Sequence, residues 1–157
     1  MHARSGGVDP GRDGCRVPIP WGGDSQPFGF SPEGATNQPW LTQPAHWADL
    51  TVERQTADPR SMLSLYREAL RLRREEPGLG DGPLTWSRSG PEVLAFFRGD
   101  RFMSLTNLSS DPLPLPPHSA VLLASADISE GHLPPDATAW LRPDRAEPTE
   151  PAREDGR

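Results

Sequence analysis

The stretch DPRSMLSLYREALRLRREEPG, from Asp58 to Gly78, carries the strongest pattern in this 157-residue chain. Its apolar residues recur at helical spacing and form one stripe. A proline at its second position suits the first turn of a helix, and the Pro-Gly pair at its end stops one. The pattern predicts a helix over residues 59–75 that Asp58 caps. The stripe consists of Met62, Leu65, Tyr66, Ala69, Leu70 and Leu72.

The residues after this helix predict an antiparallel sheet. Short apolar runs alternate with turn residues, and Gly99-Asp100 between two runs is a hairpin signal. Prolines crowd residues 112–117, which suits an edge strand or an extended connector. From Pro143 onward there is no apolar anchor, so we expect a disordered tail over 143–157. The expected strands are Leu84–Arg88, Val93–Arg98, Phe102–Asn107, Ala120–Ser125 and Thr138–Leu141.

The first 57 residues are polar and rich in Gly and Pro, yet they hold Trp21, Trp40 and Trp47. A tryptophan ring buries on the order of 150–250 Å² when it packs, so such a loop is expected to lie against something. Residues 22–47 show neither a helical nor a strand period, which indicates a long functional loop or a disordered one. The order of loop, helix and sheet therefore indicates the end of one domain followed by a smaller β domain.

Composition excludes several classes of function. The net charge of -6 argues against a nucleic-acid partner. No apolar run is long enough to cross a membrane and no secretion signal is present, so a cytoplasmic protein without a membrane partner is expected. A single cysteine excludes an internal disulfide and a multi-thiolate metal site. The four histidines share no ligand spacing, so neither a metal nor a cofactor is expected.

The segment GRDGCRVPIPW, Gly11 to Trp21, resembles the motif RDxxRTPMQW of α-glucosidases and oligo-1,6-glucosidases in glycoside hydrolase family 13. Further short motifs of that family follow in the same order, so the resemblance covers about residues 4–142. These further motifs are Gly29–Pro32, Gln38-Pro39-Trp40, Val52-Glu53 with Asp58-Pro59, and Asn107-Leu108-Ser109.

The resemblance implies an α+β fragment. Residues 1–78 would be the last βα-loop and final helix of a catalytic (β/α)8 barrel. Residues 79–142 would be a small antiparallel β domain, followed by the tail at 143–157. The intact parent would hydrolyse α-glucosidic bonds in α-glucosides or oligosaccharides, and the missing barrel fragment would be a partner. Alternatives are a non-catalytic α-glucan-binding or structural β module, and a fragment that complements a separate barrel chain.

The catalytic chemistry is expected to lie elsewhere. Retaining glycosidases need two carboxyl groups about 5–5.5 Å apart, and the family carries its carboxylates upstream of the RDxxR motif. Glu75-Glu76 and Asp13 fit a solvated-charge interpretation better than a catalytic one. We therefore expect no catalytic residue in this chain and no activity from it alone.

One residue is a candidate for substrate binding. In the family's motif the first arginine bonds a hydroxyl of the terminal glucose, and Arg12 occupies that position. A guanidinium offers several fixed donors and stays charged, although a structural ion pair is the alternative role. Asp13 and Arg16 are expected to brace the loop. Trp40 and Trp86 could form a sugar platform, but Trp86 lies in an expected strand and is assigned to the core.

Overall fold

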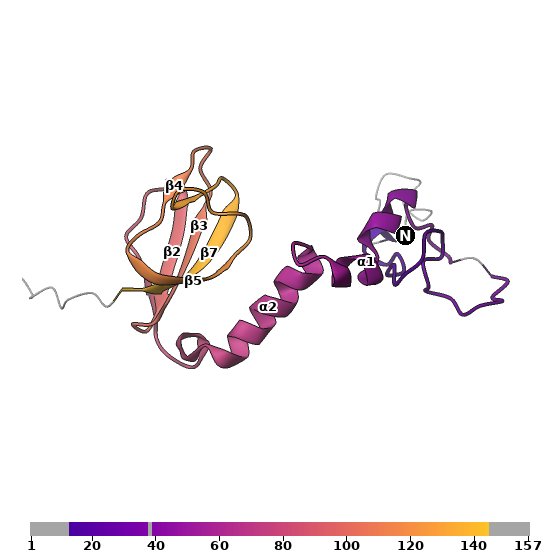
Figure 1. Ribbon diagram of the computed structural model, residues 1–157, viewed down its shortest axis with the longest axis horizontal. Helices are drawn as coiled ribbons and strands as arrows, with labels where there is room; N and C mark the ends of the chain where they lie inside the picture. The colour runs from indigo at the N-terminus through magenta and orange to yellow at the C-terminus, as the bar shows by residue number, and fades with distance from the viewer. Residues whose placement is uncertain (1–12, 38, 145–157) are drawn as a thin grey trace, which may run out of the picture. The chain divides into compact units, whose positions relative to one another are not determined.

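The computed structural model describes residues 13–37 and 39–144 (Figure 1). Between Arg67 and Glu68 the chain divides into two compact units. This division falls inside the longest helix, α2 (Met62–Glu75), so the helix contributes to both units. The domain boundary expected between residues 78 and 79 stays a prediction, and residues 145–157 of the expected tail lie outside the described part of the chain.

The first unit contains little regular structure. Its elements are η2 (Asp13–Cys15), η3 (Ala45–Leu50) and α1 (Val52–Ala57). Among the described residues between 16 and 44 there are turns and bends but no helix or strand, in agreement with the missing period in the sequence. The six-residue helix α1 was not expected, because a segment this short is too brief to display a helical period.

Helix α2 ends at Glu75 as predicted, but its start differs from the expected one. Ser61, not Asp58, caps it: the Ser61 hydroxyl accepts a hydrogen bond from the Ser64 amide at 3.2 Å. The Asp58 carboxylate instead accepts from the Arg60 amide at 2.8 Å, inside a turn that precedes the helix. The turn closes when the Ser61 amide donates to the Asp58 carbonyl, so Pro59 lies in the turn and the helix begins at Met62.

The second unit is built on a five-stranded antiparallel sheet in the order β1-β2-β3-β7-β5 (Figure 1). All five expected strands form. β2 and β3 have the expected bounds, whereas the ends of the other three differ, and β7 reaches Pro143, where the tail was expected to begin. A second, two-stranded sheet of β4 (Leu113–Pro114) and β6 (His132–Leu133) was not foreseen as a pair. The main strands are β1 (Leu84–Trp86), β2 (Val93–Arg98), β3 (Phe102–Asn107), β5 (His118–Ala124) and β7 (Ala137–Pro143).

One face of the large sheet forms the core of this unit. Three alternate residues of β7 and two alternate residues of β3 are buried on it, as the period of two requires, together with one residue of β2. Side chains from the connections between β3 and β7 pack against this face. The buried cluster consists of Ala95, Met103, Leu105, Leu133, Ala137, Ala139 and Leu141.

A fully buried asparagine joins this core to the loop after β3. The Asn107 amide donates to the carbonyls of Asp111 and Leu133 at 2.8 and 3.1 Å. Its side-chain oxygen accepts from both the amide and the hydroxyl of Ser109, at 3.0 and 2.7 Å. Every polar atom of this buried side chain is satisfied, so the Asn-Leu-Ser motif has a structural role at the end of β3.

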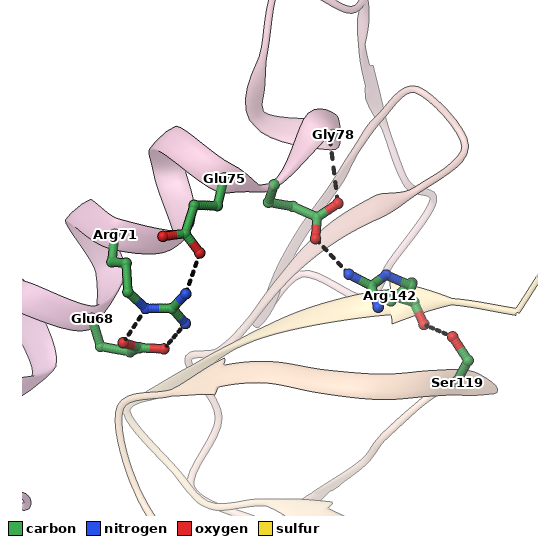
Figure 2. Close-up of polar contacts among 7 residues, drawn as sticks. Glu68, Arg71, Glu75, Gly78, Ser119 and Arg142 are labelled. Atoms are coloured by element: carbon green, nitrogen blue, oxygen red, sulfur yellow. Dashed lines mark hydrogen bonds and ion pairs between the residues drawn. The ribbon is translucent and has the colours of Figure 1, made fainter.

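The turn that ends α2 is attached to the sheet by a close contact and by an ion pair to Arg142, and Figure 2 shows the ion pair. The short helix η4 (Pro77–Leu79) places Gly78 against Phe102 of β3, so near that an added Cβ at Gly78 would lie 2.5 Å from the Phe102 Cβ. Beside it, the Glu76 carboxylate accepts a hydrogen bond from the Arg142 guanidinium of β7 at 2.6 Å. The Glu76 side chain is only 5% exposed, so this carboxylate relies on its arginine partner.

A second arginine organises the exposed face of the same helix segment. Arg71 lies between Glu68 and Glu75 and bonds to both carboxylates (Figure 2). The hydrogen bond from Arg71 lowers the pKa of Glu68. Because these side chains are exposed, solvent screens the pairs and they add little to stability.

We expect Gly78→Ala to destabilise the chain by about 1–3 kcal/mol, because the new methyl group overlaps Phe102 and forces the turn away from β3. Gly90→Ala is the matched control, since an added Cβ at Gly90 meets nothing within 4 Å. Urea unfolding monitored by circular dichroism measures both variants. Equal midpoints for the two alanine variants would show that the contact is not tight.

Candidate functional site

The expected substrate loop begins at the edge of the described residues. Arg12 lies outside them, and Asp13 opens the short helix η2. Cys15 and Arg16 follow on the surface of the first unit. The bracing role expected for Asp13 and Arg16 therefore stays a prediction, and the described loop from Pro18 onward shows how the segment is held.

A buried phenylalanine organises the middle of this loop. Phe28 is 1% exposed and takes a positive φ of 49°, which is uncommon for a residue with a side chain. Its carbonyl accepts hydrogen bonds from the amides of Trp21 and Gly22, at 2.7 and 3.0 Å. The backbone thus closes on itself between Trp21 and Phe28. No periodic pattern in the sequence could have revealed this closure.

Glu53 of α1 connects the helix to the same turn. Its carboxylate accepts from the Gly23 amide at 3.1 Å, and its own amide donates to the Trp21 carbonyl at 3.0 Å. An added Cβ at Gly22 would lie 2.7 Å from the Glu53 Oε2 atom, so a side chain there would displace the Glu53 carboxylate. Two of the short motifs, about 30 residues apart in the chain, are therefore in direct contact through Trp21 and Glu53.

Two further side chains hold the loop together. Arg54 pairs with Asp24 at 2.7 Å and with Asp49 at 3.1 Å, and its hydrogen bond to Asp24 raises the pKa of Arg54. Gln43 is 1% exposed. Its side-chain amide donates to the Pro18 carbonyl at 3.0 Å, and its backbone carbonyl accepts from the side-chain amide of Gln26. These contacts give a loop without regular structure a defined backbone path.

Three large aromatic side chains of the first unit are exposed to solvent. Trp40 is 97% exposed, and Trp21 and Phe30 are each about half exposed. Large apolar side chains exposed as a group mark interaction surfaces. In the second unit Trp86, which the sequence assigned to the core, is 63% exposed, so that assignment is wrong.

One described carboxylate differs from its expected role. Glu76 is not a solvated charge as expected, because it is buried and paired with Arg142. Beside this pair a hollow of about 540 Å³ is lined by side chains of both charges, including Asp100, Arg101 and Asp144.

Within residues 13–37 and 39–144, no three His, Cys, Asp or Glu side chains gather in a way that could hold a metal ion.

Several known proteins are similar to this chain in sequence or in fold. A glucan 1,6-α-glucosidase of Streptococcus pneumoniae serotype 4 is 31% identical over 104 residues, which are 64% of this chain and 18% of that protein. A protein of Rhizobium meliloti named "probable α-glucosidase" is 35% identical over 105 residues, with the same coverage of both chains. This chain is homologous to the C-terminal region of the α-glucosidases. No protein-family model matches it.

Solved structures support this homology to the α-glucosidases. An α-glucosyl transfer enzyme, XgtA, is 30% identical with a TM-score of 0.64, over 85% of this chain and 26% of that one. A trehalulose synthase is 26% identical with a TM-score of 0.66, over 83% of this chain and 26% of that one. A trehalose-6-phosphate hydrolase of Bacillus licheniformis, at 20% identity, shares the fold alone.

The α-glucosidase homology covers a limited part of the relatives. The chain spans about a fifth of the length of the curated relatives that it matches. The matching region of the glycoside hydrolase family 13 structures has the same mostly antiparallel sheet preceded by few helices, as expected from the sequence. In the described part of the chain, no helix combines the length and the apolar character that crossing a bilayer requires.

We expect Thr51→Ala to lower the free energy of unfolding of the loop unit by about 1 kcal/mol, because Thr51 is fully buried and its hydroxyl caps α1 through the Arg54 amide. Thr36→Ala, at an exposed position in the same loop, should change stability little. Hydrogen exchange of the α1 amides measures the effect. Identical protection in the two variants would contradict the capping role.

Proposed function

We propose that this chain is the C-terminal part of a glycosidase that hydrolyses α-glucosidic bonds in α-glucosides or oligosaccharides. The observation that carries this proposal is the 31–35% identity to two proteins named α-glucosidases over about two thirds of the chain. The intact protein would contain the catalytic barrel, as one polypeptide or as a separate partner fragment. A cytoplasmic location belongs to the same proposal.

The surface of the first unit supports a missing partner. Trp21, Phe30 and Trp40 are at least half exposed, although an indole or phenyl ring gains considerably from burial. Helix α2 carries a further apolar stripe of Met62, Tyr66 and Leu70, spaced four residues apart and 48–64% exposed. A barrel that packs against these residues would remove this surface from water.

The carboxylates of the described residues support the absence of catalysis by this chain alone. A retaining glycosidase needs one carboxylate free to attack and another free to exchange a proton. Here the Glu53 carboxylate holds the Gly23 amide, and Glu76 holds Arg142. Glu68 and Glu75 share Arg71 on the exposed face of α2. Each of these groups is occupied by a structural contact.

We expect the pure 157-residue chain to show no turnover of an aryl α-glucoside above the buffer rate, because we propose that the two carboxyl groups of the reaction lie in the catalytic barrel. Release of nitrophenol from p-nitrophenyl α-glucoside measures this directly. The control is the same assay with an intact α-glucosidase. Clear turnover by the pure chain would contradict the proposal that the catalytic groups lie elsewhere.

A chimera tests the positive half of the proposal and the role of Arg12. In it, this chain replaces the homologous C-terminal region of the Rhizobium meliloti protein. We expect a folded chimera that hydrolyses aryl α-glucosides. Arg12→Ala should lower its kcat/KM by about tenfold to a hundredfold, because a charged hydrogen bond contributes roughly 1.5–3 kcal/mol.

Arg16→Ala is the matched control in that chimera, since Arg16 is the second arginine of the motif and is proposed to brace the loop. It should lower thermal stability more than it changes kcat/KM. A folded but inactive chimera would contradict the proposed function. Equal kinetic effects of the two substitutions would remove only the assignment of Arg12 as a substrate contact.

A further inference from the structure

The two faces of the five-stranded sheet are covered very differently. One face carries the buried core of the second unit. On the other face, direct cross-strand partners place Trp86, Phe96, Ser104 and Trp140 in one row across β1, β2, β3 and β7. At the η4 end this face is closed by the contact of Gly78 with Phe102. At the β1 edge it stays open, and Trp86 is 63% exposed there.

The ring of Trp86 is held in place although it is exposed. It meets the ring of Phe96 edge-on, with centroids 5.7 Å apart and planes at 77°. This geometry is a favourable one for an aromatic pair and restricts the rotation of the indole. Trp40, at 97% exposure, has no ring contact within the described residues. Of these two tryptophans, only Trp86 is oriented in advance.

Backbone hydrogen-bonding groups lie beside this ring. The Ser87 amide donates to the Ala95 carbonyl, and the Gly99 amide donates to the Pro83 carbonyl. In an antiparallel pair these bonds alternate, so the amide and carbonyl of Trp86 point away from β2. Because β1 is the edge strand of the sheet, these groups lie at its free edge. Trp86 thus offers an apolar ring, and beside it a backbone amide and a backbone carbonyl that both point away from the sheet.

The size and charge of this patch favour a small neutral ligand over a protein. At 63% exposure, Trp86 offers on the order of 100–160 Å² of open surface. Leu84 and Leu94, at 46% and 45% exposure, extend the patch, which stays well below the roughly 800 Å² per partner of a stable protein interface. Arg98, which lies on this face opposite Leu84, donates a hydrogen bond to the Gly80 carbonyl.

We propose that Trp86, braced by Phe96, is a stacking platform for a glucosyl ring of an α-glucan chain. A pyranose has an apolar C–H face that covers an indole and a rim of hydroxyls that bond to the backbone groups at the β1 edge. The choice of glucan as the sugar class rests on the proposed function. The platform binds the polymer without cleaving it.

Native gel electrophoresis of the full chain through dextran and through amylose tests this platform. The wild type and Trp40→Ala should be retarded relative to a gel without polysaccharide. Trp86→Ala should bind about tenfold more weakly, since loss of a stacked ring removes an aromatic contact of that order. If circular dichroism shows that Trp86→Ala does not fold, Trp86→Thr is used in its place, because threonine also removes the ring but favours β-strands.

Three outcomes would overturn the proposal. The wild type migrates freely in both polysaccharides, the Trp86 variant is retarded as strongly as the wild type, or sedimentation shows that Trp86→Ala changes the oligomeric state. The last outcome would assign the surface to a second copy of the chain. Failure here and failure of the proposed function are separable, because glucan retardation does not require hydrolysis and the active chimera does not require retardation.

Discussion

The attachment of the helix end to the sheet is the constraint on which the second unit depends. The Glu76 side chain is only 5% exposed, and burying a carboxylate costs free energy unless a partner of opposite charge lies beside it. Arg142 provides that partner from the last strand. The absence of a side chain at Gly78 then lets the turn approach β3. Together these contacts determine how the last part of α2 meets the sheet.

The first unit is stabilised by hydrogen bonds in turns and from side chains. With few helical or strand ladders, its backbone groups need partners from turns and side chains. Phe28, Glu53 and Gln43 provide them by closing the loop at separate points. Two of the motifs that resemble the α-glucosidases meet where the Glu53 amide donates to the Trp21 carbonyl, so these motifs have a physical role in the fold of the loop. This role is independent of any contact with a substrate.

The homology and the exposed surface point in the same direction. The relatives are about five times longer than the region they share with this chain. The chain exposes aromatic side chains in both units, at Trp40 and at Trp86. We attribute the first to packing against a catalytic barrel and the second to a glucan chain. These surfaces differ in that only Trp86 has a neighbouring ring that orients it.

The sequence alone determined the elements whose signals are local. The apolar stripe and the Pro-Gly stop predicted the end of α2, and alternating runs predicted all five strands of the large sheet. Two-residue strands such as β4 and β6 are too short to carry a period, so their pairing could not be read. The choice of Ser61 over Asp58 as the cap of α2 depends on the turn between them, which the local pattern does not specify.

Only the tertiary structure decided which side chains are buried or paired across long separations. Glu76 looks like a solvated residue at a helix end until Arg142, 66 residues later, is brought beside it. Trp86 fits a core strand by its type, but burial depends on what covers its face of the sheet, and β1 lies at the edge. Local spacing determines secondary structure, whereas burial and charge pairing depend on the arrangement of distant segments in space.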